Sequence, residues 1–90
     1  MIQVIGHTDN QPRRNTDNLD YSALRATTVA RLFIQDHNLG ANRIIAAAKG
    51  PFAPKASNET PEGRTENRRI EILVTYRDSD LIRDVQKQLQ

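Results

Sequence analysis

Three short segments of this 90-residue chain hold the side chains best suited to recognising a charged ligand. They are residues 6–10 (GHTDN), 22–26 (SALRA) and 62–72 (EGRTENRRIEI). Asp9 supplies a carboxylate, while Arg25 and the third segment supply guanidinium groups. A carboxylate binds an ammonium group, and the planar fork of arginine grips a carboxylate at two points. The segments therefore indicate a recognition site for a zwitterion that carries an amine and a carboxylate a few bonds apart.

The first segment lies where a predicted strand gives way to a loop. Residues 2–6 (IQVIG) are apolar, mostly β-branched and short, and they end in glycine, which is typical of a strand. Residues 7–20 contain Pro12 and several arginine, aspartate and asparagine residues, a composition that predicts a loop. Asp9 is therefore expected at the start of a loop that directly follows a strand.

The second segment begins a predicted helix. Alanine and phenylalanine recur at helical spacing from about residue 21 to 38, with Asp20 or Ser22 as the N-cap and Gly40 as the stop signal. Arg25 is then expected in the first turn, where a cation opposes the helix dipole unless an anion lies beside it.

The remaining elements follow from the same patterns. Residues 43–48 predict a second strand, residues 49–66 a long polar loop, and residues 69–76 a third strand. An amphipathic terminal helix is predicted from an apolar stripe that consists of Leu81, Ile82, Val85 and Leu89. Such a stripe covers a sheet more often than it binds a partner, and we favour the first interpretation.

Together these elements predict an α+β fold, a two-layer α/β sandwich that opens with a right-handed βαβ unit. The chain length allows one domain, which we assign to residues 1–76, followed by the terminal helix in residues 77–90. Three strands make a slender sheet, so we expect a further strand and its helix upstream of Met1. Any export signal or membrane anchor is also expected upstream.

Composition excludes several classes of function. The formal charge of +2 comes from thirteen basic and eleven acidic residues that are interleaved along the chain rather than grouped in blocks, which argues against nucleic-acid binding. Cysteine is absent, so disulfides and thiolate catalysis are excluded. No apolar run approaches the roughly 20 residues that cross a bilayer.

Metal binding and catalysis have weak support in the sequence. His7 and Asp9 form a His-x-Asp pair, but the only other histidine, His37, is predicted at a helix end, and two ligands do not make a metal site. Ser22 and Ser57 lack a recognisable histidine partner. We therefore expect no catalytic residue, no metal and no cofactor.

The three segments, in this order, resemble the OmpA/MotB C-terminal domain, a peptidoglycan-binding module of bacterial envelopes. The resemblance spans residues 2–76. It rests on Gly6 to Asp9, on Asn18, Tyr21, Ser22, Arg25 and Ala26, and on Gly63, Arg64, Asn67, Arg68 and Arg69. Residues 56–60 (ASNET) resemble the flagellar stator branch in particular. Tyr21 departs from the family pattern, which usually has leucine there.

The resemblance implies a role for each matching residue. Asp9 is expected to pair with the amine of diaminopimelate in the peptide stem, and Arg25 with its carboxylate. Thr8 and Asn10 are expected to shape the pocket. Asn67 and Arg68 are expected to begin the last strand beside the pocket and to contact the ligand there. Arg69 is expected to alternate to the opposite face, and Asn18 to fix the loop.

The implied function is a non-catalytic, periplasmic anchor that ties a membrane ion-channel complex, the flagellar stator, to the cell wall as a homodimer. Its membrane partner would be reached through the upstream region. One alternative is an outer-membrane protein or lipoprotein that tethers the outer membrane to peptidoglycan. Another is an enzyme that acts on peptidoglycan, which would need a metal or a nucleophile with a base.

Overall fold

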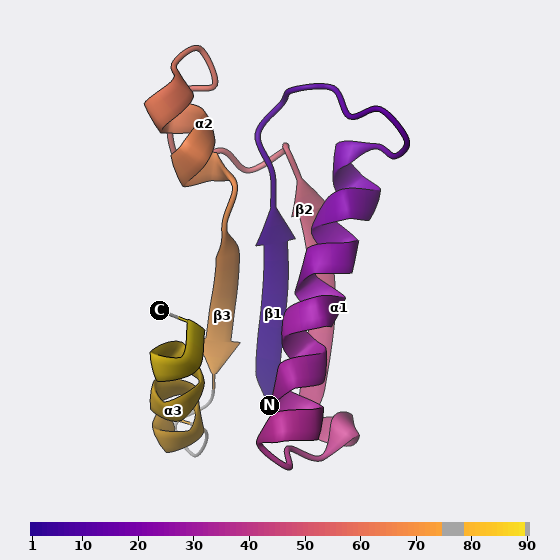
Figure 1. Cartoon of the computed structure of the whole chain (residues 1–90), viewed down its shortest axis with the longest axis vertical. Coiled ribbons are helices and arrows are strands. Elements are labelled where there is room, and N and C mark those ends of the chain that lie inside the picture. The colour runs from indigo at the N-terminus through magenta and orange to yellow at the C-terminus, as the bar shows by residue number, and fades with distance from the viewer. Residues whose placement is uncertain (75–78, 90) are drawn as a thin grey trace.

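The computed structural model describes residues 1–74 and 79–89, and Figure 1 shows their arrangement. In chain order the elements are β1 (Ile2–His7), α1 (Asn18–Asp36), the short 3-10 helix η1 (Ala41–Arg43), β2 (Ile44–Gly50), α2 (Pro61–Asn67), β3 (Ile70–Val74) and α3 (Ser79–Leu89). The three strands form one sheet in the order β2-β1-β3. The predicted α+β class and two-layer arrangement are confirmed.

The central strand β1 pairs in opposite senses with its two neighbours. It runs parallel to β2, with Val4 opposite Ala46, and antiparallel to β3, with Val4 opposite Ile72. Helix α1 connects the parallel pair across one face of the sheet, and Figure 1 shows this crossover to be right-handed, as predicted. The carboxyl ends of β1 and β2 therefore meet at one edge of the sheet, together with the start of α1 and with α2.

The hydrophobic core lies between the sheet and the two long helices. Its fully buried members include Ile2 and Val4 from β1, Phe33 from α1 and Val85 from α3. Helix α1 presents a stripe that includes the small residues Ser22, Ala26 and Ala30 to the sheet, and it lies close to β1 at Gly6, where an added Cβ would lie 2.1 Å from the carbonyl oxygen of Ser22. A side chain at that position would push the helix away from the strand.

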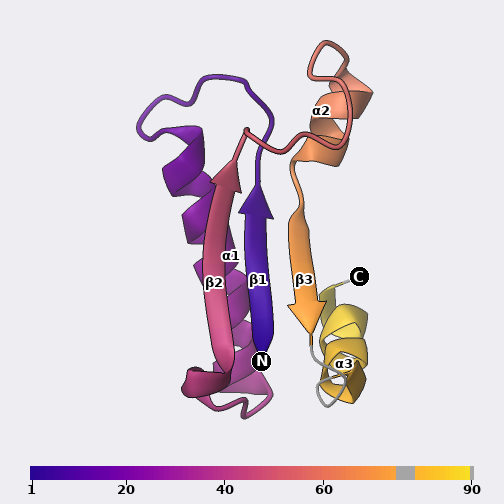
Figure 2. The same cartoon turned by 180° about the vertical axis from the view of Figure 1, so that it is seen from behind.

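Helix α3 packs on the same face of the sheet as α1, as the opposite views in Figures 1 and 2 show. Val85 is 1% exposed, and Gln88 lies 2.8 Å from the ring of His37 at the end of α1. Leu89 is half exposed. The side chains of Leu81 and Ile82 lie outside the described residues, so of the predicted stripe only Val85 is seen to cover the sheet.

Helix α1 differs from the prediction at both ends. It begins at Asn18, because the Asp17 carboxylate accepts a hydrogen bond from Asp20 N at 2.7 Å and forms the N-cap. The predicted caps, Asp20 and Ser22, are wrong. The helix ends at Asp36, and Asn38 rather than Gly40 adopts the left-handed conformation, with φ of 57°.

Two other boundaries were wrong. The predicted strand 43–48 begins one residue later and extends to Gly50, because Arg43 belongs to η1. The last strand begins at Ile70, and its predicted end at residues 75–76 lies outside the described residues. The predicted loop 49–66 contains helix α2, which the sequence reading missed.

Candidate functional site

Asp9 lies just beyond the carboxyl end of β1, in a backbone fixed by its neighbours. Thr8 N donates to the carbonyl oxygen of Gly50 at 2.9 Å, which links the end of β1 to the end of β2. The Thr8 hydroxyl donates to the carbonyl oxygen of Asp9 at 2.8 Å, and the Thr8 side chain is buried. Thr8 therefore shapes the turn that presents Asp9 and has no exposed surface of its own.

Both oxygens of the Asp9 carboxylate are hydrogen bonded within the protein. Oδ1 accepts from Gln11 N at 3.0 Å, and Oδ2 accepts from Nη1 of Arg68 at 2.6 Å. The Asp9 side chain is 5% exposed, whereas that of Arg68 is 40% exposed. The carboxylate is thus nearly covered, with the guanidinium group on its solvent side.

The electrostatics keep Asp9 ionised. Burial raises the pKa of Asp9, but the hydrogen bonds from Gln11 and Arg68 and the charges of Arg68 and Arg13 together outweigh it and lower the pKa from its usual 3.8. A covered carboxylate that stays charged at neutral pH is suited to binding a cationic group.

Arg68 reaches Asp9 from the end of helix α2. The backbone N–H of Arg68 donates to Arg64 O at 3.1 Å and closes the helix, and its Nη2 donates to the Thr65 hydroxyl at 2.9 Å. Arg68 was expected to begin the last strand, which is wrong. The residue is the C-cap of a helix, and this places its side chain beside Asp9, 59 positions away in the sequence.

Helix α2 carries a start signal that the sequence reading overlooked. Thr60 accepts a hydrogen bond from Gly63 N at 3.0 Å, Pro61 occupies the first turn, and Glu62 adds an acidic group there. At Gly63 an added Cβ would lie 1.8 Å from the carbonyl oxygen of Ser57, so glycine allows the helix to pack on the preceding loop.

Asn67 organises this loop from the inside. It was predicted to begin the last strand, but it is the final residue of α2 and is fully buried. Its Oδ1 accepts from Lys55 N at 2.8 Å and Ala56 N at 2.9 Å, while its Nδ2 donates to Ala56 O and Asn58 Oδ1. The carboxamide is fully satisfied within the protein, so the prediction that Asn67 contacts ligand has no geometric support.

Arg25 lies on α1, flanking the buried stripe that includes Ser22 and Ala26, and its side chain is half-buried. Because the helix begins at Asn18, Arg25 is the eighth residue rather than part of the first turn, about 10 Å along the axis. The argument from the helix dipole therefore does not apply to it. Within residues 1–74 and 79–89 its guanidinium has no hydrogen bond or ion pair, so it is available to an anion.

The loop between Asp9 and α1 is ordered by a second arginine. Arg13 stacks on the ring of Tyr21, with its guanidinium carbon 3.4 Å from the ring centroid, and its Nε donates to Asn18 Oδ1 at 3.0 Å. Asn18 in turn donates to Gln11 O, so it fixes the loop as predicted. Asn10 is exposed, and its side-chain oxygen accepts a hydrogen bond from the side chain of Gln11.

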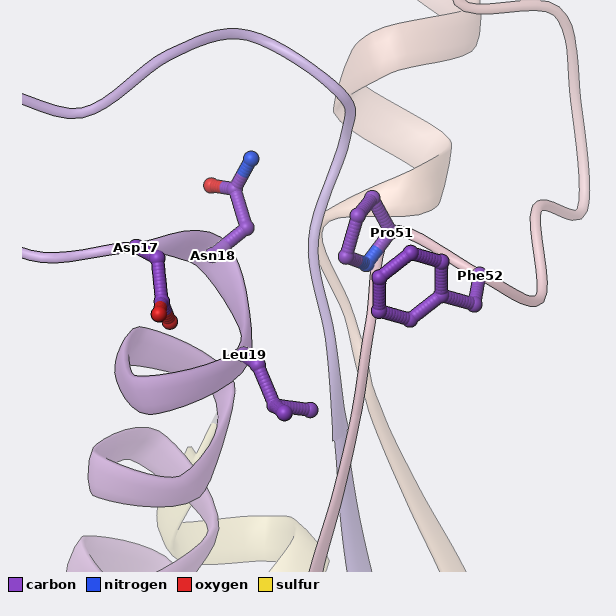
Figure 3. A pocket seen from close by; sticks show the side chains of 5 residues that line it. All are labelled: Asp17, Asn18, Leu19, Pro51 and Phe52. Atoms are coloured by element: carbon purple, nitrogen blue, oxygen red, sulfur yellow. The ribbon is translucent and has the colours of Figure 1, made fainter.

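A surface pocket of about 330 Å³ lies at the start of α1, on the same edge of the sheet. Figure 3 shows Leu19 on one side and Pro51 and Phe52 on the other, with Asn18 turned up toward the loop. Phe52 is 78% exposed. The polar atoms of Asp17 and Asn18 already serve the helix cap and the loop, so the pocket is apolar in character.

His7 and Arg69 have structural contacts. The buried ring of His7 donates from Nε2 to Glu71 at 3.0 Å, and this hydrogen bond lowers the pKa of Glu71. Arg69 donates to Ala53 O at 3.1 Å.

The described residues contain no group of three or more histidine, cysteine, aspartate or glutamate side chains that could hold a metal ion. Among the helices described, none has the length and apolar character of a membrane span.

Similarity to known proteins agrees with this architecture. Residues 1–68 match the model of the OmpA family. The chain is 40% identical over 79 residues to Motility protein B of Bacillus subtilis, which covers 84% of this chain and 30% of that protein. It is 38% identical over 73 residues to the peptidoglycan-binding protein ArfA of Mycobacterium tuberculosis, covering 81% of this chain and 22% of that protein.

Among solved structures, the C-terminal domain of Helicobacter pylori MotB superposes with a TM-score of 0.74 at 28% identity, covering 97% of this chain and 67% of that domain. The chain spans less than a third of the length of Motility protein B and of ArfA. The family match extends over three quarters of the sequence and includes both Asp9 and Arg68. The chain belongs to the OmpA family.

Proposed function

We propose that this domain binds peptidoglycan without catalysis, through a diaminopimelate-type residue of the stem peptide. Asp9 would receive the ammonium group, and Arg25 would receive the carboxylate of the same amino-acid head. The single observation that carries the proposal is the covered, ionised carboxylate of Asp9 at the end of β1. Hydrogen bonds from the Thr8 hydroxyl and from Gln11 N fix the turn that holds it. The peptidoglycan-binding relative in Mycobacterium tuberculosis supports the choice of ligand.

The supporting residues have distinct tasks in this proposal. Thr8 fixes the turn at Asp9, and Asn10 lies exposed beside it. Arg68 adds positive charge at the rim. Asn67 acts indirectly, because its buried carboxamide holds the loop against which α2 packs.

The affinity of one site is expected to be modest. Charge-assisted hydrogen bonds contribute about 1.5–3 kcal/mol each when they are shielded from water. Two or three such bonds must offset the cost of immobilising a flexible stem peptide. Firm attachment would therefore come from several domains that engage one polymer.

The test is a pull-down with purified sacculi. Asp9→Asn and Arg25→Ala should each reduce the bound fraction at least tenfold, because each removes one charged partner of the zwitterion. Asp36→Asn and Arg31→Ala are the matched controls, since both residues lie exposed on α1 and change the net charge equally. Circular dichroism must show all four variants folded. If Asp9→Asn and Arg25→Ala bind as well as the controls, the site lies elsewhere.

The same sacculi test the absence of catalysis. Incubation with the domain should release no muropeptide, because within residues 1–74 and 79–89 neither Ser22 nor Ser57 is hydrogen bonded to a histidine. Released muropeptides would show that the chain is an enzyme.

For the full-length protein we propose an anchor of the flagellar stator, located in the periplasm and acting as a homodimer with a membrane partner. Its similarity to Motility protein B and to the MotB C-terminal domain supports this choice. A strain that carries Asp9→Asn at the native locus should lose spreading in soft agar while it keeps its flagella. Normal spreading would instead favour the tether to the outer membrane.

A further inference from the structure

We propose that Arg68 occupies the ligand site when no ligand is bound. On binding, the ammonium group of the ligand would replace the guanidinium group of Arg68 at the Asp9 carboxylate. The inference rests on the proposed function, because it concerns the same carboxylate. It adds Arg68 as a residue that determines the affinity of the site and its selectivity among cations.

The first argument is the coverage of Asp9. Its side chain is 5% exposed, one oxygen is taken by Gln11 N, and the other is held by Arg68 at 2.6 Å. Because so little of the side chain is exposed, a second cation has no open approach to the remaining lone pairs while Arg68 is in place, and the guanidinium would also repel it. A ligand amine must therefore displace Arg68 in order to reach Asp9.

The second argument is that Arg68 can leave Asp9 without leaving the site. Its side chain is 40% exposed, and its Nη2 donates to the Thr65 hydroxyl at 2.9 Å. That hydroxyl donates to Pro61 O at 3.0 Å, which fixes it as an acceptor. A guanidinium has five N–H donors, so a displaced Arg68 can still donate hydrogen bonds to the carboxylate of the incoming ligand, in addition to those from Arg25.

The third argument separates Arg68 from the neighbouring arginine. Arg13 also lowers the pKa of Asp9 through its charge. It is held elsewhere, however, by the ring of Tyr21 and by Asn18. Of these two cations only Arg68 contacts the carboxylate, so only Arg68 competes directly for it.

The experiment compares two probes by NMR titration of the isotope-labelled domain. One probe is diaminopimelate, and the other is 1,5-diaminopentane, which has the same kind of amine but no carboxylate. The backbone amide of Gln11, which donates to Asp9, reports occupancy of the site. The variants are Arg68→Gln, the matched control Arg31→Gln on the exposed face of α1, and Asp9→Asn.

Arg68→Gln should bind 1,5-diaminopentane about tenfold more tightly than the wild type, because one charge-assisted competitor has been removed. Its gain for diaminopimelate should be smaller, since the released guanidinium no longer receives the carboxylate. Arg31→Gln should change neither affinity. Unchanged or weaker binding of the diamine by Arg68→Gln would overturn the exchange.

A second measurement uses only the wild type, and so does not depend on how the variant folds. The side-chain Nη and Nε resonances of Arg68 should shift on addition of either probe, and unshifted resonances at saturation would also overturn the exchange. Failure of the proposed function has a different signature. In that case Asp9→Asn and the wild type would bind diaminopimelate equally well.

Discussion

At the scale of single residues, the site depends on a carboxylate that the protein keeps charged although it is covered. Burial alone would favour the protonated form of Asp9, and this cost is offset by the N–H of Gln11 and by the guanidinium of Arg68. In the proposed exchange a neutral side chain could not perform this role, because an ammonium group must be attracted by an ionised acid in order to displace Arg68.

The lowered pKa of Asp9 makes part of the stability dependent on pH. Because the pKa is depressed in the folded state, the contribution is fully present above the unfolded value of 3.8 and is lost as the pH falls below it toward the folded pKa. The free energy of unfolding of Asp9→Asn should therefore be about 2 kcal/mol lower than that of the wild type at pH 7. The difference is modest because Arg68 is partly screened by solvent.

The measurement is urea denaturation of wild type and Asp9→Asn from pH 7 to pH 2. The difference in free energy of unfolding should shrink steadily below the unfolded pKa. Asp36→Asn, an exposed carboxylate on α1, serves as the control and should differ little from wild type throughout. A difference for Asp9→Asn that is independent of pH would contradict the assigned cause.

At the scale of elements, the site is held by close contacts between the start of α1 and the ends of the parallel strands. The hydroxyl of Ser22 accepts from Gly50 N at 3.0 Å and donates to Leu19 O at 2.8 Å, which ties α1 to β2. The backbone of α1 meets that of β1 at Gly6. These contacts fix where the loop that contains Asp9 must begin and end.

Gly6→Ala should therefore be strongly destabilising. The added methyl group would lie 2.1 Å from the backbone carbonyl oxygen of Ser22, which cannot move without shifting the helix. We expect a loss of about 3 kcal/mol in the free energy of unfolding, measured by urea denaturation.

Gly40→Ala is the matched control. Gly40 has a φ of −60°, and a Cβ there would meet no backbone atom, only the side chains of Asn42, whose Oδ1 would lie at 2.8 Å and can rotate away, and of Arg43, at 3.9 Å. Its effect should stay within about 0.5 kcal/mol. Equal losses for the two variants would mean that the contact between α1 and β1 is not what constrains residue 6.

At the scale of the whole molecule, the terminal helix belongs to the same core as the sheet. Val85 of α3 is buried in a cluster that includes Val4 and Phe33, although the sequence pattern alone places residues 77–90 after the domain. A buried apolar side chain in α3 implies that the helix and the sheet unfold together.

Val85→Ala should lower the free energy of unfolding of the entire domain by roughly 2 kcal/mol, because a core side chain is truncated. Fluorescence of a label near Asp9 and far-ultraviolet circular dichroism should report the same transition. Leu89→Ala, at a half-exposed position on the same helix, should have little effect. Separate transitions for the two probes would mean that α3 folds independently.

The sequence alone determined the family, the strand β1, the helix α1 and the placement of Asp9 immediately after β1. These features are local, because strand and helix periods and a glycine-histidine-threonine-aspartate motif are legible over a few neighbouring residues. The start signal of α2 is equally local, because it consists of Thr60 as the N-cap and Pro61 in the first turn.

Only the tertiary structure decided which arginine meets Asp9. That contact joins residues 59 positions apart and depends on the orientation of α2, which is set in turn by the buried carboxamide of Asn67 and the close packing at Gly63. No local pattern encodes such an orientation, since it results from hydrogen bonds and steric contacts between distant segments. For the same reason Asn67 was taken for a residue of the site, whereas its position in the fold makes it part of the support beneath it.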